Sequence, residues 1–276
     1  MNQGEAMKIT FIGGGNMASA LIGGLLQQGF KASEVFVVEH NAEARTTLSS
    51  TFEIRLFPQI CAEALQVDLL VLAVKPQQLK AVAEELRPLL REQILVSIAA
   101  GVRAEDLARW LGDYPRVVRA MPNTPALVRA GVTGLFALPG VNAQQRAQAQ
   151  QVLAAVGSCV WLSDEGQMDA VTAVSGSGPA YVFYFIEALE AAAIELGLSA
   201  EQGRELALAT FLGASQLARA STDAPATLRA KVTSKGGTTE RAIETLEQSD
   251  VQTLIRRAVC AAALRSQEMG EALGKA

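Results

Sequence analysis

Short apolar runs alternate with amphipathic stretches of helical spacing over the first part of the chain. Residues 68–74 form a nearly continuous apolar run, which is typical of a parallel strand buried on both faces. Strands that alternate with helices of about 10–15 residues predict a doubly wound α/β sheet. The predicted strands are 7–12, 35–39, 68–74, 94–98, 116–120, 132–138 and 159–162, and the predicted helices are 17–28, 42–50, 76–90 and 143–156.

The pattern changes near Ser163, after which the spacing of apolar residues is helical throughout. Within residues 181–196, apolar side chains fall on nearly every face of the predicted helix, and a helix of this kind is buried by other protein. We expect the cover to be a second copy of the chain, interlocked with the first. A compact monomeric bundle is the alternative. The predicted helices are 167–174, 179–196, 200–219, 225–231, 239–248 and 251–270.

Three consecutive glycines follow the first predicted strand and precede a helix. Gly13, Gly15 and Ala18 match G-x-G-x-x-A, in which the first glycine permits a tight turn and the second lets the backbone approach a pyrophosphate. The helix start attracts anions because its first N–H groups lack partners. The strand and helix on either side are the context that the motif requires. The predicted cofactor contacts at this turn are Gly13, Gly15, Asn16 and Met17.

Glu39 ends the second predicted strand, where an acid usually accepts from the ribose 2′-hydroxyl of NAD. Such an acid repels the 2′-phosphate of NADP. His40 and Asn41 follow directly and offer hydrogen bonds to that phosphate, so the sequence leaves NAD(H) and NADP(H) both open. A solvated charge at the end of a strand is the alternative interpretation of Glu39.

Three further loops leave the predicted strands at their carboxyl ends, where open α/β sheets bind ligands. Lys75 precedes a helix that starts at Pro76, the small residues after Ser97 leave room for a flat ring, and two prolines stiffen the loop around Asn123. Each loop alone is equally compatible with an ordinary strand–helix connection. The predicted cofactor contacts are Ala73, Val74, Lys75, Pro76, Ala99, Ala100, Asn123 and Thr124.

A second glycine turn, Gly236-Gly237, precedes the predicted helix 239–248 in the helical part. Its N–H groups predict a site for a small anionic substrate. The segment 175–179 also interrupts the helical pattern, either as a turn between helices or as a functional break. The sequence thus predicts an α/β protein with an N-terminal Rossmann dinucleotide-binding domain, 1–163, and an all-helical C-terminal domain, 164–276, for dimerisation and substrate binding.

Composition narrows the choice of partners. The formal net charge is −4 and no run of basic residues stands out, so nucleic acid is not an expected partner. The single histidine and three scattered cysteines predict neither a His-based catalytic triad nor a metal site. Residues 1–7 lack a signal pattern, and the longest uncharged run, 170–186, is broken by glycine and proline. We therefore expect a cytoplasmic protein with no membrane helix.

Five motifs together closely resemble one family, from about Lys8 to Met269. In order, they are Gly-Gly-Gly-Asn-Met-Ala, Ala-Val-Lys-Pro, Met-Pro-Asn-Thr-Pro, Ser-Gly-Ser-Gly-Pro-Ala-Tyr and Gly-Gly-Thr-Thr. The chain resembles pyrroline-5-carboxylate reductase, in which NAD(P)H reduces L-1-pyrroline-5-carboxylate to L-proline in the last step of proline biosynthesis. The resemblance implies a Rossmann domain followed by a helical domain that interlocks with its twin. Dimers of the family often build larger rings, commonly decamers of five dimers.

The resemblance also implies roles for individual residues. The N–H groups of Gly237 and Thr238 would hold the substrate carboxylate, and the hydroxyl of Thr239, the implied catalytic residue, would bond the ring nitrogen. Lys235 departs from the proline that is common in the family, and Glu39 departs from the neutral or basic residues of NADP-preferring members. The implied substrate contacts are Ser234, Gly236, Gly237, Thr238, Thr239, Met121 and Asn123, and the implied nicotinamide contacts are Val74, Lys75, Ala99, Asn123 and Thr124.

Two other functions fit parts of the pattern. A β-hydroxyacid dehydrogenase also pairs a Rossmann domain with helices, but it needs a lysine from the helical part. Lys231 and Lys235 are the only lysines between residues 164 and 270. The second alternative is a scaffold that senses a dinucleotide without turnover. Turnover of an imine but not of a hydroxy acid distinguishes the three.

Overall fold

The computed structural model describes residues 7–275, so most of the segment 1–7, which lacks a signal pattern, lies outside the described residues. The chain forms two compact units, one of Met1–Ser177 with Ala262–Ala276 and the other of Gly178–Ala261. The segment from residue 164 onward is therefore shared between both units. The strands are β1 Ile9–Ile12, β2 Val35–Val38, β3 Arg55–Phe57, β4 Leu69–Leu72, β5 Ile94–Ser97, β6 Val117–Met121, β7 Gly131–Ala137 and β8 Gly157–Trp161.

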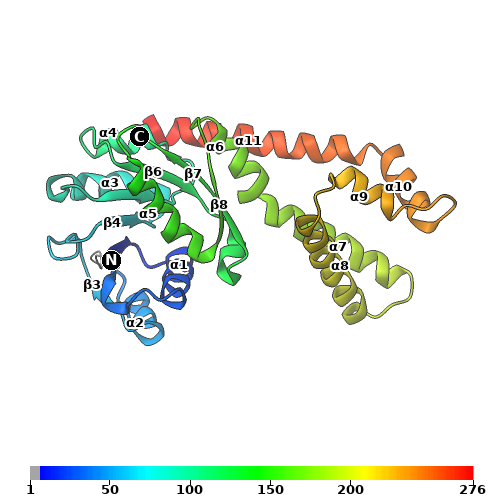
Figure 1. Ribbon diagram of the computed structural model, residues 1–276, viewed down its shortest axis with the longest axis horizontal. Coiled ribbons are helices and arrows are strands. Elements are labelled where there is room, and N and C mark those ends of the chain that lie inside the picture. Colours follow the sequence, from blue (N-terminus) through cyan, green and yellow to red (C-terminus); the bar gives the residue numbers. More distant parts are fainter. Residues whose placement is uncertain (1–6, 276) are drawn as a thin grey trace. The chain divides into compact units, whose positions relative to one another are not determined.

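The strands of the first unit form one sheet in the order β3-β2-β1-β4-β5-β6-β7-β8 (Figure 1). Neighbouring strands are parallel except β6 and β7, which run antiparallel. The strand order reverses between β1 and β4, and ligands of open α/β sheets bind outside the carboxyl ends of the strands at such a point. The doubly wound sheet expected from the sequence is confirmed. Its helices are α1 Asn16–Gln27, α2 Ala42–Thr51, α3 Pro76–Leu86, α4 Ala104–Trp110, α5 Ala143–Leu153 and α6 Gln167–Val171.

Helices cover both faces of this sheet, and strand β4 shows why its sequence is apolar throughout. Leu69 and Val71 pack in one core cluster with residues of α1 and α5, whereas Leu70 and Leu72 pack in the other cluster with α3 and α4. Successive side chains of a strand point to opposite faces, so a sheet covered on both sides requires apolar residues at every position.

One strand and one α-helix of the sheet unit were not predicted. Strand β3 is only three residues long and begins with the exposed Arg55, so it carries no apolar run. Its pairing with β2, which sets Phe57 beside Val38, defines it instead. Helix α4 has seven residues, too few for a clear helical period. The predicted helices 76–90 and 143–156 each end in a short 3₁₀ turn, which the apolar period does not separate from α-helix.

The segment predicted as a break at residues 175–179 includes the end of a π-helical segment and a bend at Ser177. Helix α6 passes into a π-helical segment, Thr172–Gly176, in which the N–H of Ser177 donates to the Thr172 carbonyl at 2.8 Å. Helix α7 then starts at Gly178. The π-helical segment ends at Gly176, and Ser177 lies between it and α7. The wider π turn also shifts the register of the side chains before this break.

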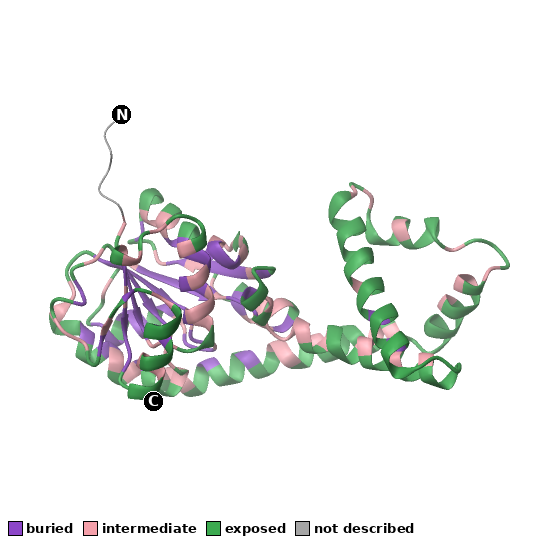
Figure 2. Ribbon diagram, turned by 90° about the horizontal axis from the view of Figure 1, so that it is seen from below, coloured by how far each residue is buried: buried purple, intermediate pink, exposed green. Residues whose placement is uncertain are grey.

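The second unit consists of α7 Gly178–Glu195, α8 Ala200–Ala220, α9 Pro225–Lys231, α10 Thr238–Gln248 and the start of α11 Val251–Lys275. Helix α7 contains no buried residue although its sequence is strongly apolar. Helix α8 buries only Gly203 and Ala207. Figure 2 colours this unit almost entirely as exposed or intermediate. Exposed apolar side chains on this scale mark a surface that another protein covers.

Candidate active site

A cavity of about 620 Å³ lies at the carboxyl ends of β1, β2 and β4. Ile12 and Val38 are the last residues of β1 and β2, and Ala73 directly follows β4. The structure thus brings together the first glycine turn, the residues after β2 and the loop after β4, as the sequence predicts for a cofactor site. Predicted residues that line it are Gly13, Gly15, Glu39, His40, Asn41, Ala73, Val74 and Lys75.

Gly13 and Gly15 serve different purposes in the turn. Gly13 has a φ of +99°, and a Cβ there would lie 2.8 Å from the carbonyl oxygen of Ala73. Gly15 has an ordinary φ of −72°, and a Cβ there would meet no atom within 4 Å. Gly15 is also the N-cap of α1, a helix start with no side-chain cap and no acid in its first turn. The space beside Gly15 therefore stays open to an anion at a positive helix end.

This contrast predicts two different mutant phenotypes. Gly15→Ala should change the free energy of unfolding by less than about 1 kcal/mol, the range of N-cap substitutions. It should weaken cofactor binding about tenfold or more, because its methyl group occupies the open space and the phosphate loses a charge-assisted hydrogen bond of about 1.5–3 kcal/mol. Gly13→Ala should lower both the free energy of unfolding and the affinity for the cofactor, because alanine strains the backbone at this position. Urea unfolding and fluorescence titration with the cofactor measure the two effects.

Gly23→Ala is the matched control, since a Cβ at Gly23 in α1 would make only an ordinary contact, 3.5 Å from the Phe52 ring. It should keep both stability and cofactor affinity. A Gly15→Ala protein that binds the cofactor as tightly as the wild type would contradict the role of this turn.

The carboxylate of Glu39 is fixed at the wall of the cavity. Glu39 is 9% exposed, and its two oxygens accept from two backbone N–H groups: Oε2 from Gly14 at 2.9 Å and Oε1 from Asn41 at 2.8 Å. His40 Nδ1 lies 3.4 Å from Oε1. Glu39 is therefore a buried acid with a fixed direction, and the solvated strand-end charge considered from the sequence does not describe it.

Other predicted cofactor contacts lie at neighbouring positions and do not line this cavity. Asn16 and Met17 begin α1, Pro76 begins α3, and Ala99 is buried after β5. Sequence analysis missed Gly14, Pro58, Gln59, Ile60 and Gln78, which do line it. The loop that contains Pro58 follows β3, and an unrecognised strand leaves no signal for the loop after it. The predicted contacts that do not line the cavity are Asn16, Met17, Pro76, Ala99, Ala100, Asn123 and Thr124.

Asn123 is a buried bridge between segments. Its Oδ1 accepts from the Val132 N–H at 2.9 Å, and its Nδ2 donates to the Ser175 carbonyl at 3.1 Å. The acceptor belongs to the π-helical segment. A Cβ at Gly176 of the same segment would lie 2.6 Å from Cε of Met121, so Met121 packs there too. The amide of Asn123 thus joins the end of β6 to β7 and to the π-helical segment.

Asn123→Ala should lower the free energy of unfolding by about 1–3 kcal/mol, because it leaves the Val132 N–H and the Ser175 carbonyl without this partner. Urea unfolding measures the loss, and Thr124→Ala at the exposed neighbour is the control, expected to be near neutral. Equal stability of the two variants would mean that the amide bridge contributes nothing.

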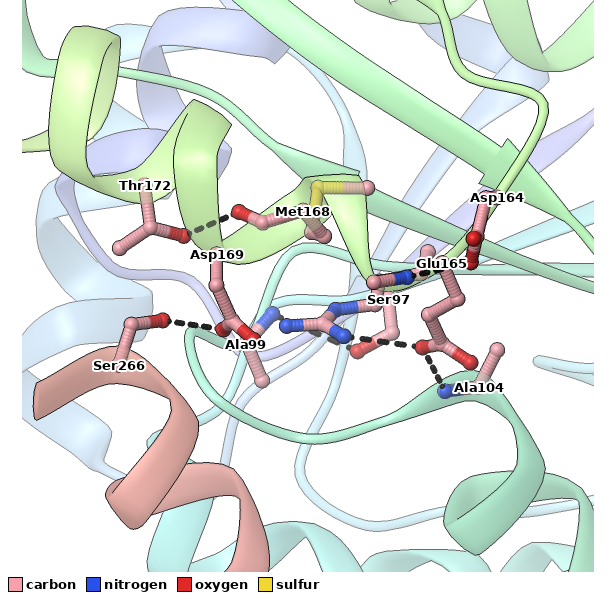
Figure 3. A network of polar contacts seen from close by, with 11 residues as sticks. Ser97, Ala99, Ala104, Asp164, Glu165, Met168, Asp169, Thr172 and Ser266 are labelled. Atoms are coloured by element: carbon pink, nitrogen blue, oxygen red, sulfur yellow. Dashed lines mark hydrogen bonds and ion pairs between the residues drawn. The ribbon is translucent and has the colours of Figure 1, made fainter. Parts of the chain in front are cut away.

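A polar network fastens the segment after β8 to the sheet (Figure 3). Glu165 Oε1 accepts from Arg119 Nη1 on β6 at 2.9 Å and from the Ala104 N–H at the start of α4 at 2.6 Å. Further along, the hydroxyl of Ser266 on α11 donates to Asp169 Oδ1 on α6 at 2.6 Å. Arg119 is 5% exposed, so the ion pair is largely shielded from water. The network positions α6 and the end of α11. No short sequence motif predicts it.

The second glycine turn lies before α10. Gly236 has a φ of +74° and its N–H donates to Glu240 Oε2 at 2.6 Å, while the Gly237 N–H donates to the Ser234 carbonyl at 3.0 Å. Gly237 is the N-cap, so Thr238 and Thr239 are the first two residues of the helix. Helix geometry leaves the N–H groups of the first turn without intrahelical partners. Of the two N–H groups expected to hold a carboxylate, that of Gly237 is used within the turn.

Other groups that the sequence singled out do not assemble into a reactive site. Cys61, Cys159 and Cys260 are free, and burial raises the pKa of the Cys159 thiol, which favours the unreactive protonated form.

Within residues 7–275 no cluster of three or more His, Cys, Asp or Glu side chains is placed to hold a metal ion. None of the helices in that range combines the length and apolar character that crossing a bilayer demands. Lys235 is exposed.

The parallel sheet and the cavity at its switch point define a dinucleotide-binding protein of the Rossmann class. Residues 8–101 match the family model described as NADP oxidoreductase coenzyme F420-dependent, and residues 165–269 match pyrroline-5-carboxylate reductase dimerisation. The chain is 48% identical to the pyrroline-5-carboxylate reductase of Pseudomonas aeruginosa, over 97% of this chain and 98% of that protein. The chain belongs to the pyrroline-5-carboxylate reductase family.

Solved structures of the family agree with this assignment. The pyrroline-5-carboxylate reductase of Coxiella burnetii has a TM-score of 0.92 and 41% identity, covering 96% of this chain and 99% of that one. The pyrroline carboxylate reductase of Plasmodium falciparum, with NADP bound, has a TM-score of 0.85 and 30% identity over 96% and 99% of the two chains. The resemblance drawn from the five motifs is confirmed, as is the class of NAD(P)H-dependent oxidoreductases.

Proposed function

We propose that this chain reduces L-1-pyrroline-5-carboxylate to L-proline with NAD(P)H, the last step of proline biosynthesis. One observation supports the proposal most directly. A chain that belongs to the reductase family over nearly its whole length has an open glycine turn and a buried acid in a cavity at the switch point of its sheet.

Several groups that line the cavity suit parts of a dinucleotide. The uncapped start of α1 and the free space at Gly15 suit a pyrophosphate, and Glu39 suits the hydroxyls of a ribose. Asn16 and Met17 contribute the first N–H groups of α1. Along the sheet edge, Val74, Lys75, Ala99 and Thr124 follow strands or begin the next element, and we assign them to the nicotinamide side.

The substrate is assigned to the turn before α10. The N–H groups at the start of that helix, beginning with Thr238, suit the carboxylate of a small anion. The hydroxyl of Thr239 is assigned to the ring nitrogen, which makes Thr239 the catalytic residue. Ser234, Gly236 and Gly237 shape the turn, and Met121 and Asn123 complete the proposed substrate contacts from the end of β6.

The reaction requires little proton transfer by side chains of the protein. When bound, the reduced nicotinamide supplies a hydride to the imine carbon, and the ring nitrogen carries the proton of the product amine. An imine that arrives protonated is already electrophilic, so no side chain has to supply a proton during hydride transfer. The residues of the chain then act by aligning the imine carbon and by accepting a hydrogen bond from the protonated nitrogen.

The assignment is tested by following oxidation of NADH and NADPH with pyrroline-5-carboxylate as substrate. Reduction of oxidised cofactors by 3-hydroxyisobutyrate is the control for dehydrogenase activity. Imine-dependent oxidation is the expected result. Activity with the hydroxy acid alone would overturn the assignment and reduce the Gly237–Thr239 turn to a structural cap.

The helical part is assigned to an interlocked homodimer. A cavity of about 550 Å³ opens between α7, α8, α10 and α11, and it is lined mainly by apolar side chains, among them Phe185, Leu189 and Phe211. The match of residues 165–269 to a dimerisation model supports a second copy of the chain as the cover. We assign residues 1–163 to cofactor binding and residues 164–276 to dimerisation and substrate binding.

Two finer assignments rest on resemblance to the family. We assign a decamer of five dimers as the larger assembly, which analytical ultracentrifugation distinguishes from a free dimer. We assign the protein to the cytoplasm, which fractionation of cells followed by immunodetection would test.

A further inference from the structure

The geometry around Glu39 points to a cofactor preference that the sequence leaves open. Its carboxylate, nine-tenths buried, is fixed by the Gly14 N–H at 2.9 Å and the Asn41 N–H at 2.8 Å. Each carboxylate oxygen accepts one of these bonds, so the side chain cannot turn away without breaking them. The negative charge therefore stays at the wall of the cavity, beside the glycine turn.

We propose that Glu39 makes this enzyme selective for NADH over NADPH, an inference that rests on the proposed function. The ribose of NADH presents neutral hydroxyls that can donate to a carboxylate, whereas NADPH presents an anionic phosphate at the same place. Like charges brought together in a shielded site repel strongly, which discriminates against the second ligand.

Several donor groups of the loop after β2 make hydrogen bonds within that loop. The N–H of Asn41 donates to Glu39, and its Oδ1 accepts from the Ala44 N–H at 2.9 Å as the cap of α2. Arg45 Nη1 donates to the carbonyls of Glu39 and His40, both at 2.8 Å. His40 Nδ1 faces the Glu39 carboxylate at 3.4 Å. The Asn41 N–H and one nitrogen of Arg45 thus support Glu39 and its backbone.

The experiment compares kcat/KM for NADH and NADPH at one fixed pH and salt concentration, together with dissociation constants of both cofactors measured by fluorescence without substrate. The wild-type protein should favour NADH by about tenfold or more, equivalent to about 1.4 kcal/mol. Glu39→Gln removes the charge at nearly constant shape, and it should reduce this ratio about tenfold, mainly by improving NADPH. Glu43→Gln, an exposed acid in the first turn of α2, is the matched control and should keep the ratio within about twofold.

A wild-type preference for NADPH, or a ratio unchanged in Glu39→Gln, would overturn the inference. Failure of the proposed function looks different, because then neither cofactor is oxidised in the presence of the imine. The dissociation constants still decide the preference in that case. If Glu39→Gln does not fold, the dissociation constants of NADH and NADPH for the wild-type protein still decide the preference.

Discussion

Thr239→Ala should lower kcat/KM for pyrroline-5-carboxylate by about 10- to 150-fold. The substitution removes one hydrogen bond to a charged ring nitrogen, and such bonds contribute about 1.5–3 kcal/mol. The loss should appear with either cofactor, and the dissociation constant of the cofactor should stay near that of the wild type, because Thr239 belongs to the unit of α7–α10 and not to the sheet. Steady-state kinetics and fluorescence titration measure the two quantities.

Thr245→Ala is the matched control in the same helix. Its hydroxyl donates to the Arg241 carbonyl at 3.0 Å, so the variant loses a local bond of ordinary kind and should retain full activity. Thr239→Ser, which keeps the hydroxyl, should recover most of the activity lost in Thr239→Ala. An undiminished rate for Thr239→Ala would remove Thr239 from the mechanism and leave the turn with a binding role only.

Leu189→Asp should dissociate the proposed homodimer. Leu189 on α7 is 45% exposed and lines the apolar cavity of the second unit, where a carboxylate would be desolvated by the partner copy. A central interface residue of this kind contributes about 2 kcal/mol or more, so the dimer dissociation constant should rise about 30-fold or more. Activity should fall with it, because the Gly236–Thr239 turn belongs to a unit whose helices have almost no core of their own. Light scattering and sedimentation measure the mass over a range of concentrations.

Gln144→Asp introduces the same charge on the exposed surface of α5 and should leave both mass and activity unchanged. Leu189→Ala should give an intermediate effect, since it removes apolar surface without adding charge. If Leu189→Asp stays dimeric at low concentration, α7 does not form the centre of the interface, and the monomeric bundle considered from the sequence becomes the better description.

Local patterns account for the elements that the sequence predicts well. The turn at Gly13–Gly15 is recognisable because strand, turn and helix lie within twenty residues of one another, and the buried strand β4 is recognisable because every position is apolar. Strand β3 has neither property. It forms because Arg55–Phe57 pairs with β2. The sequence of these three residues alone does not predict that pairing.

The site shows the same division. Glu39 is predictable as an acid at the end of a strand, but its bond to Gly14, 25 positions away, depends on the pairing of β1 with β2. Asn123 is predictable as a polar residue at the sheet edge, yet the structure uses its amide to bridge Val132 and Ser175. A motif specifies which residue types stand near a ligand. It does not specify which of their hydrogen bonds are already taken.

The sequence by itself determined the class of fold, the change from sheet to helices near Ser163, and the two glycine turns, because periodicity and turn chemistry act over a few residues. Only the tertiary structure decided that β7 runs antiparallel to β6, that the end of α11 belongs with the sheet unit, and that Arg119 meets Glu165. Those features join residues far apart in the chain. Their energies depend on burial and on strand register, which arise only when distant segments pack together.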